Sequence, residues 1–285
     1  MKKLLALLLA LLTLASLSAC KKDDESEEAN RESFRREEVI LNSYTDGDSV
    51  YYFEMVDTET VAITGYSGST ALHDATVPSV VYTGEDKDAT AKTVVAIAEG
   101  AFKNVSSIKK ISIPEGVTTI GKYAFAYCAH LETVEFPSTL ATIGEGAFYQ
   151  SGLTTLTFPQ TCQLTAIDKV TFSKCDKLTE VTIPSYIKTV GESAFFKCES
   201  LTKITLSEGV ESVALMGFYG CPALVEVNLP STLQNTNPIV DLAFLGGDAL
   251  RIENVNVPEE APATLVTYVE SMALYLKEDP ASTQS

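Results

Sequence analysis

One apolar pattern recurs through most of the chain at intervals of about 23 residues. Residues 190–230 hold it nearly twice: an aliphatic residue, a phenylalanine five positions later, and then a run of spaced aliphatic residues. Aligned on the ring, the copies are 23, 23, 24, 23, 23 and 26 residues apart and centre on Phe102, Phe125, Phe148, Phe172, Phe195, Phe218 and Phe244. A repeated period of this length is typical of a solenoid, in which each coil packs only on its neighbours.

Each copy ends in a short apolar run that predicts a half-buried strand, because alternate residues of a strand point to the same face. One further copy precedes the first ring, at Leu72, Ala75 and Val77. Eight strands are expected, carrying the apolar pairs Ala75/Val77, Ile111/Ile113, Val134/Phe136, Leu156/Phe158, Val181/Ile183, Ile204/Leu206, Val227/Leu229 and Val255/Val257. Proline closes seven of the eight runs, which suits a strand end because proline has no N–H to give to a ladder.

Strands about one period apart cannot pair as hairpins, since the chain must return to the same side between them. We therefore expect a parallel sheet that rises about 4.8 Å per coil. The return segments carry apolar pairs of their own, such as Val117 with Ile120 and Leu140 with Ile143, which predict a second, shorter extended face. A Gly-x-x-Ala-Phe turn then brings one ring into the interior of each coil.

The recurring I-x-x-x-A-F-x-x-C-x-x-L-x-x-I-x-I-P resembles the BspA-like family of bacterial leucine-rich repeats over about residues 72–258. The resemblance implies a β-rich leucine-rich-repeat solenoid of seven to eight stacked coils with a parallel sheet on one face. Departures from the pattern are expected to alter single loops: Thr171 and Gly217 replace alanine, Asp168 and Ala214 replace glycine, one residue is missing near Ser151, and residues 160–163 and 234–238 are additional.

The two ends of a solenoid need atypical segments that cover its apolar interior. Residues 50–55 and 60–65 predict two strands of an N-terminal β cap, and residues 83–93 a polar excursion. Residues 263–277 predict an amphipathic helix as a short C-terminal cap, with Leu265, Val269, Met272 and Leu276 on one side. The expected organisation is a signal peptide with lipobox (1–20), an acidic tether (21–37), the N-terminal cap and first coil (38–95), the repeats (96–258), and the C-terminal cap and tail (259–285).

The start of the chain predicts export. Lys2 and Lys3 precede an apolar run over 4–17, which is too short to cross about 30 Å of hydrocarbon as a helix and suits a secretory signal. Leu17-Ser18-Ala19-Cys20 resembles the lipobox of bacterial lipoproteins. This resemblance implies a lipid on Cys20 that anchors the protein to a membrane; an incidental cysteine after an ordinary secretory signal is the alternative.

Residues 21–38 are rich in acids and poor in apolar side chains, which is typical of an unstructured tether. Lys22-Asp23-Asp24-Glu25 resembles the signal that sends some Gram-negative lipoproteins to the outer surface, although a solvated charge run is an equal interpretation. The expected location is the bacterial cell envelope, outside the cytoplasm, with outward display left open.

The net charge and the types of reactive side chain argue against several classes of function. The net charge of −17 argues against nucleic acid as a partner, because its recognition depends on lysine and arginine meeting phosphate. The histidines, His73 and His130, lie in different coils without the spacing of a catalytic triad. No glycine-rich phosphate loop or metal-ligand cluster is found in the sequence, so neither an enzyme nor a cofactor or metal site is expected.

Four cysteines share one position of the repeat, three residues after the ring: Cys128, Cys175, Cys198 and Cys221. The equivalent positions in other coils are Val105, Ser151 and Gly247, which indicates a small buried slot. Packed free thiols are the favoured interpretation, while a disulfide or a metal site stays open. Cys162, in a lengthened loop, is expected to be the most exposed cysteine of the repeats.

Two surfaces are candidates for binding. On the sheet, the outward columns include Glu135 and the alternating charges Glu180, Lys203 and Glu226, which should stabilise neighbouring strands. On the turns, the aromatic residues Tyr149, Phe196 and Tyr219 directly follow the buried ring and Tyr127 comes one residue later. Aromatic residues on an edge can anchor a partner, but packing between turns or a merely soluble sheet face explains both sets equally well.

The family resemblance implies a non-catalytic, lipid-anchored surface protein whose repeats bind a protein or glycan outside the cell, as in adhesion. The alternative is a structural or accessory envelope lipoprotein that scaffolds a neighbouring complex. An envelope hydrolase serves only as a contrasting hypothesis.

Overall fold

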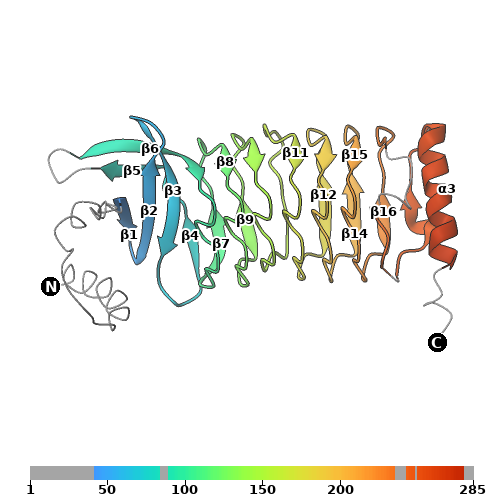
Figure 1. Cartoon of the computed structure of the whole chain (residues 1–285), viewed down its shortest axis with the longest axis horizontal. Helices are drawn as coiled ribbons and strands as arrows, with labels where there is room; N and C mark the ends of the chain where they lie inside the picture. The colour runs from blue at the N-terminus through green and yellow to red at the C-terminus, as the bar shows by residue number, and fades with distance from the viewer. Residues whose placement is uncertain (1–41, 84–88, 235–241, 248, 279–285) are drawn as a thin grey trace, which may run out of the picture. The chain divides into compact units, whose positions relative to one another are not determined.

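The computed structural model describes residues 42–83, 89–234, 242–247 and 249–278. All of them belong to one compact unit, Leu41–Ser285. Within this unit successive coils lie side by side, and most of them contribute a short strand to each of two faces (Figure 1). The predicted leucine-rich-repeat solenoid with a parallel sheet face is therefore confirmed.

The first face, called the main face here, consists of parallel strands with one strand per coil. Alternate residues point inward, so that Ile111, Val181 and Ile204 are fully buried while their neighbours reach solvent. The strands are β4 (His73–Thr76), β7 (Ile108–Ser112), β9 (Thr133–Glu135), β12 (Glu180–Ile183), β14 (Lys203–Leu206), β16 (Glu226–Asn228) and β17 (Val255–Asn256).

The second face is also parallel, and its strands beyond the first have two residues each. Three of these strands are followed by the repeat glycine, where adjacent coils approach closely: a Cβ on Gly121 would lie 2.6 Å from the backbone nitrogen of Glu99. The strands are β6 (Thr90–Ile97), β8 (Thr119–Ile120), β10 (Thr142–Ile143), β11 (Ala166–Ile167), β13 (Thr189–Val190) and β15 (Ser212–Val213). The predicted second extended face is confirmed.

Both faces are interrupted at the same level of the stack, between β9 and β12 and between β10 and β11. We call this level the seam, and residues 154–158 the seam segment. The strand expected around Leu156 and Phe158 is wrong: the seam segment has no strand pairing, although Leu156 is still buried. The missing residue before it and the additional residues after it change the path of the chain, while Thr154 N–H still donates to Glu132 O at 3.1 Å.

A column of phenylalanine rings runs through the interior without interruption. Neighbouring rings stack with centroids 4.8 to 5.5 Å apart and planes within 17° of each other, from Phe102 to Phe244. All seven rings are buried. The seam lies between the coils of Phe148 and Phe172, whose ring centroids are 5.3 Å apart. The core is therefore continuous at the level where the strands of both faces are interrupted.

The N-terminal strands form a meander that joins the second face. β1 (Asn42–Asp46), β2 (Ser49–Met55) and β3 (Thr60–Ser67) are antiparallel, and β3 then pairs in parallel with β6. The two strands predicted over 50–55 and 60–65 are confirmed. The polar excursion is partly a hairpin, because β5 (Val80–Thr83) pairs antiparallel with β6; residues 84–88 between them lie outside the described residues.

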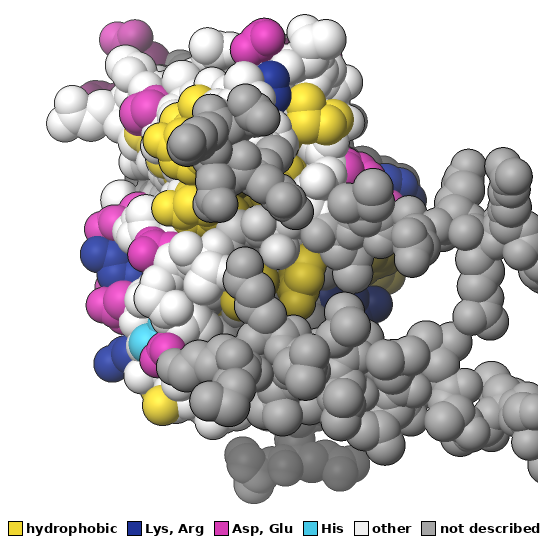
Figure 2. Space-filling model, turned by 90° about the vertical axis from the view of Figure 1, so that its left-hand side faces the viewer, with side chains coloured by type: hydrophobic (Ala, Val, Ile, Leu, Met, Phe, Trp, Pro, Cys, Tyr) yellow, Lys and Arg dark blue, Asp and Glu magenta, His cyan; other side chains and the backbone are white. Residues whose placement is uncertain are grey.

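Hydrophobic side chains remain exposed near this end. Figure 2 looks onto it and shows yellow side chains on the face, with acidic and basic ones along one margin. Leu72, which opens the apolar run of the first copy, is 57% exposed. It precedes β4, so only Ala75 and Val77 of that run point inward.

At the other end, the short helix η2 (Ile252–Asn254) leads to β17 and then to α3 (Ala263–Glu278). The predicted amphipathic helix is confirmed: Leu265 and Met272 are buried and Val269 packs against the core. Tyr268, which the sequence pattern did not single out, is also fully buried, and the side chain of Leu276 lies outside the described residues. No helix in the described part of the chain has the length and apolar character that crossing a bilayer requires.

Candidate functional site on the turn edge

The turns around the buried rings have an unusual backbone that recurs in every coil. In the coil of Phe125, Tyr123 (φ 51°) and Tyr127 (φ 63°) are both left-handed, two residues before and two residues after the ring. With a left-handed residue on each side of the ring, every second N–H group of the turn points to the next coil, while Ala124 and Ala126 donate within their own turn. Accordingly the N–H groups of Tyr123, Phe125 and Tyr127 donate to the next coil, at 3.0, 2.7 and 2.8 Å from its carbonyl oxygens.

These hydrogen bonds form a ladder along the whole edge, which we call the turn ladder. It crosses the seam: Gly146, Phe148 and Gln150 donate to the carbonyl oxygens of Lys169, Thr171 and Ser173 at 3.1, 2.9 and 3.0 Å. The turn edge is consequently held in register where both sheets are broken, and it is a rigid place for side chains that could meet a partner.

Three tyrosines and a lysine from neighbouring turns surround one cavity. Tyr127, which is 41% exposed, meets Tyr149 edge to face with ring centroids 5.4 Å apart. The Lys103 ammonium lies 5.8 Å from the centroids of both the Tyr123 and Tyr127 rings. The cavity has a volume of about 350 Å³ and is lined by Lys103, Tyr123, Tyr127, Tyr149 and Val170; we call it the tyrosine–lysine pocket.

A second cavity of about 340 Å³ adjoins the pocket and shares Tyr127 with it. Lys174 lines the second cavity, and its ammonium lies 5.8 Å from the ring centroid of Tyr149, which lines the first. The second cavity also contains Asp176 and Lys177. Burial, together with the charge of Glu199, raises the pKa of the Asp176 carboxyl.

The other two aromatic candidates lie further along the edge and pack on each other. Phe196 and Tyr219 stack with centroids 6.0 Å apart and planes 9° apart, and Lys197 lies 5.3 Å above Phe196. Tyr219 also covers the next turn, because a Cβ on Gly246 would lie 2.6 Å from its ring. The structure thus brings Tyr127 and Tyr149 together in a pocket and places Phe196 and Tyr219 in a separate packed pair.

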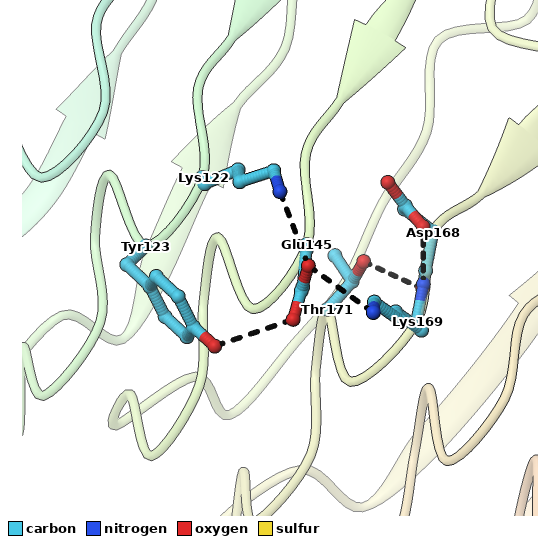
Figure 3. Close-up of polar contacts among 6 residues, drawn as sticks. All are labelled: Lys122, Tyr123, Glu145, Asp168, Lys169 and Thr171. Carbon is cyan, nitrogen blue, oxygen red and sulfur yellow. Dashed lines mark hydrogen bonds and ion pairs between the residues drawn. The ribbon is translucent and has the colours of Figure 1, made fainter.

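Beside the pocket, other charges on the edge neutralise each other (Figure 3). Glu145 lies between the ammonium groups of Lys122 at 3.3 Å and Lys169 at 3.4 Å, and the Tyr123 hydroxyl donates to it at 3.4 Å. Burial opposes ionisation of Glu145, but the hydrogen bond from Lys122 and the charge of Lys169 outweigh it and lower the pKa of the carboxyl. Asp168 caps its own turn by accepting from the N–H of Lys169 at 2.7 Å.

The candidate charges of the main face are mostly paired. Lys203 meets Glu226 at 2.9 Å and Lys110 meets Glu135 at 2.6 Å. Hydrogen bonds, from Asn228 and then Lys203 for Glu226 and from Lys110 and then Ser112 for Glu135, lower the pKa of both carboxyls.

Glu180 lies opposite Lys203 in the register, but no ion pair to it is found in the described part of the chain. It lines a groove of about 430 Å³ at the seam, whose other residues include Thr155, Thr157, Phe158 and Thr182. The main face thus offers one unpaired acid in a groove of threonines.

The cysteines of the repeat slot are hydrogen-bond donors to the backbone. The thiols of Cys128, Cys175, Cys198 and Cys221 lie 3.0 to 3.4 Å from the carbonyl oxygen of the phenylalanine of the preceding coil. Burial raises the pKa of Cys128 and of Cys175 to about 12, so these thiols stay protonated. All four are free thiols, in agreement with the packed slot.

Cys162 is half-buried rather than fully exposed, and its thiol donates to Leu140 O at 2.9 Å. It is nevertheless the most accessible of the described cysteines. Cys20, the predicted lipidation site, lies outside the described residues.

The described residues offer no arrangement that points to catalysis or metal binding. No group of three or more potential metal ligands occurs among them. His73 bonds to the Tyr66 hydroxyl at 2.7 Å, and His130 bonds to Ser106 O at 2.9 Å. The His130 imidazole is therefore tied to the backbone of the preceding coil, and the His73 imidazole to a tyrosine of β3.

Sequence reasoning missed Lys103, Tyr123 and Lys174 as members of the site. These three residues are far apart in the chain. Each lies at or next to a left-handed position of its turn, and the turn ladder brings these turns together. An alignment of the repeats on the ring could have identified them. In that alignment Tyr123 lies two residues before its ring, Lys103 one residue after its ring and Lys174 two residues after its ring.

Comparisons with known proteins agree with this architecture. The family model for the BspA type leucine rich repeat region matches six copies over residues 95–225 and 165–259. Among solved structures, the leucine rich repeat protein of T. pallidum is 31% identical with a TM-score of 0.54, over 62% of this chain and 78% of that one.

A leucine rich cell surface protein from Faecalibacterium prausnitzii is 28% identical with a TM-score of 0.55, over 73% of this chain and 55% of that one. This chain thus spans little more than half the length of that protein. A search of curated proteins gave no match. On the repeats, the ring column and the family match, the chain belongs to the BspA-type leucine-rich-repeat family.

Proposed function

We propose that this protein is a non-catalytic, lipid-anchored surface protein of bacteria. Its repeats bind a protein or glycan ligand outside the cell through the tyrosine–lysine pocket. The observation that carries the proposal is the pocket itself: three tyrosines and a lysine from neighbouring turns around one cavity. A related chain is described as a leucine rich cell surface protein, and repeats of this family are generally scaffolds, which supports the location and the absence of catalysis.

The pocket suits binding because it combines aromatic area with a rigid frame. Tyrosine gives large amphipathic contact area with few torsions to freeze, and it is enriched at binding hot spots. The turn ladder holds Tyr123 and Tyr127 by their own N–H groups, so little backbone entropy would be lost when a ligand binds.

The main face is the weaker candidate. Glu135, Lys203 and Glu226 satisfy their charges within the sheet, and a partner would have to break those pairs before using them. Glu180 in its groove is the one candidate of this face that offers an unpaired charge among the described residues.

Binding assays with purified protein test the proposal. The protein should bind to at least one class among immobilised matrix proteins, whole cells and glycans. The double variant Tyr127→Ala/Tyr149→Ala should lose about tenfold or more in affinity, the magnitude expected for buried aromatic anchors. The matched control is Phe196→Ala, another aromatic residue of the same edge outside the pocket, which should bind as the natural chain does.

Two results would contradict the proposal. Binding that survives the double tyrosine variant would remove the pocket from the function. Absence of binding to every outside ligand, with capture of envelope proteins instead, would favour an accessory scaffold of the envelope.

The anchor is tested separately by changing Cys20→Ser. We expect the natural chain to partition into membranes, because a lipid on Cys20 would hold it at a membrane. Cleavage by protease added to intact cells tests outward display separately. The variant should appear in the soluble fraction. A variant that still partitions into membranes would mean that Cys20 is not the anchor.

A further inference from the structure

We propose that the tyrosine–lysine pocket recognises a carboxylated sugar, such as a uronic or sialic acid residue of a glycan. This inference rests on the proposed function, since it names the ligand class of the same pocket. The observation behind it is a pair of lysines that lie against tyrosine rings, in a chain whose net charge is −17.

Lys103 and Lys174 differ from the neighbouring lysines in their partners. Lys122 and Lys169 meet Glu145, and on the main face Lys110 and Lys203 meet glutamates. Among the residues that the structure describes, Lys103 and Lys174 form no ion pair and lie over ring faces instead. A cation–π contact at an exposed site is worth about 0.5–1 kcal/mol. Each lysine would therefore lose little if it left the ring to form a charge-assisted hydrogen bond with an anionic ligand.

The tyrosine rings favour a ligand that has an apolar face in addition to its negative charge. Tyr127 and Tyr149 meet at 85°, so one ring can lie flat against the C–H face of a sugar while the other closes the side. Their hydroxyls can bond to sugar hydroxyls, as the polar ends of tyrosines do in binding sites. A glutamate side chain of a protein has the carboxylate but no comparable flat apolar face.

Size and charge place the ligand within the pocket. A cavity of about 350 Å³ is near the lower limit of small-ligand sites, which suits one sugar residue or two. Asp176 lies in the adjoining cavity and would repel an acid there. The carboxylate of the ligand therefore belongs on the Lys103 side, with Lys174 at the border.

The test uses ligand pairs that differ only in the charge of the sugar. Titration calorimetry of the full exported chain would compare a short oligogalacturonate with its methyl ester, and sialyllactose with its methyl ester. The acidic member of at least one pair should bind about tenfold more tightly, as one charge-assisted hydrogen bond implies. The difference should shrink as salt is added.

Variants assign this difference to residues. Lys103→Gln should reduce the preference for the acid to about twofold or less, and Lys174→Gln should reduce it in part. The matched control is Lys122→Gln, a lysine of the same edge that is already paired with Glu145, and it should keep the preference. Tyr127→Ala/Tyr149→Ala should weaken acidic and neutral sugars alike.

The outcomes separate this inference from the proposed function. Equal binding of acidic and neutral sugars, or an unchanged preference in Lys103→Gln, overturns the inference. Tyrosine-dependent binding of matrix protein or of a glutamate-rich peptide, without sugar binding, also overturns it and leaves the proposed function standing. Binding to no cell, matrix protein or glycan contradicts the proposed function itself.

Discussion

Each ring of the phenylalanine column packs on the ring of the next coil, so one side chain supports two neighbours. Phe195 illustrates this, with rings stacked on both of its sides at 5.2 and 4.8 Å. The cysteine slot beside the column acts in the same way, because each thiol bonds back to the carbonyl of the preceding coil. A change at a ring is therefore expected to act on three coils at once, and a change at a slot cysteine on two.

Replacing Phe195 by alanine should lower the free energy of unfolding by about 3–5 kcal/mol, through lost transfer energy and the cavity left behind. Phe196→Ala is the matched control, since its ring lies at the partly exposed edge and should cost much less. Chemical denaturation measures both. A cost below about 1 kcal/mol for Phe195→Ala, ordinary for a surface change, would contradict the stacked column.

Val170 is a β-branched residue in the left-handed region, with φ 50°. Residues other than glycine and asparagine are disfavoured there by about 1–2 kcal/mol. Val170→Asn should therefore raise the free energy of unfolding by about 1 kcal/mol. Val225→Asn is the control for the change of residue type, because Val225 is more exposed than Val170 and has no positive φ. No gain, or an equal gain in both variants, would mean that the backbone strain is not relieved.

The raised pKa of Cys128 predicts a pH-dependent contribution to stability. Its pKa is about 12 in the folded chain against an ordinary value of 9.0, so the unfolded state loses its proton first. The contribution is fully present below pH 9.0 and is lost as the pH rises towards 12, at about 1.4 kcal/mol per pH unit within that window.

Denaturation of the natural chain and of Cys128→Ser at several alkaline pH values measures this effect. Serine fills the same slot in another coil at Ser151 and does not ionise, so groups other than this thiol cancel in the comparison. The advantage of the natural chain should shrink above about pH 9. A difference that is constant with pH would show that the thiol is hydrated in the fold.

At the level of elements, the regular strands were predictable and the seam was not. Where the period of 23 residues holds, alternate apolar residues identify the strand and its buried side, as at β14 and β16. The seam segment keeps this alternation at Leu156 and Phe158, yet the missing residue before it and the added ones after it redirect the chain. Periodicity reports which side is buried; it does not report whether the neighbouring backbone is in reach for a hydrogen bond.

The candidate site was only half predictable for a related reason. Tyr127 and Tyr149 are separated by nearly one period, so their proximity follows from the repeat. The roles of Lys103 and Lys174 depend on side-chain direction next to or at a left-handed turn position, and lysine does not indicate such a backbone by itself.

Hydrogen exchange should identify the seam as the least protected level of the repeats. Amides of residues 155–158 have no backbone partner among the described residues, whereas the equivalent residues 203–206 lie in β14 between two parallel strands. Unpaired amides exchange through small local openings, so residues 155–158 should exchange much faster than 203–206. Slow exchange over 155–158 would mean that the sheet is continuous. Amides of the turn ladder at 146–150 are the internal control and should stay protected.

At the scale of the whole molecule, stacked coils bury their interior only when both ends are covered. The described chain has a β meander before the first coils and α3 after the last, with Leu265, Tyr268 and Met272 buried. These two segments are outside the repeat pattern, and covering the ends is the physical reason for a solenoid to have them. The C-terminal helix gives the cleaner test, because it follows the last coil and can be removed without altering the path of the coils.

Deleting residues 263–285 should expose the apolar end of the last coil, including Leu250 and Val255, which are buried in the intact fold. Burial of apolar surface is worth about 25 cal/mol per Å², so the exposed end should associate with a second copy, fray, or do both. The deletion variant should be partly dimeric in light scattering and should melt at a lower temperature. Deleting only residues 279–285, which follow α3, should change neither property. A monomer with the original melting temperature after the longer deletion would show that the last coil is stable without its helix, and α3 would then need a role other than covering the end of the stack.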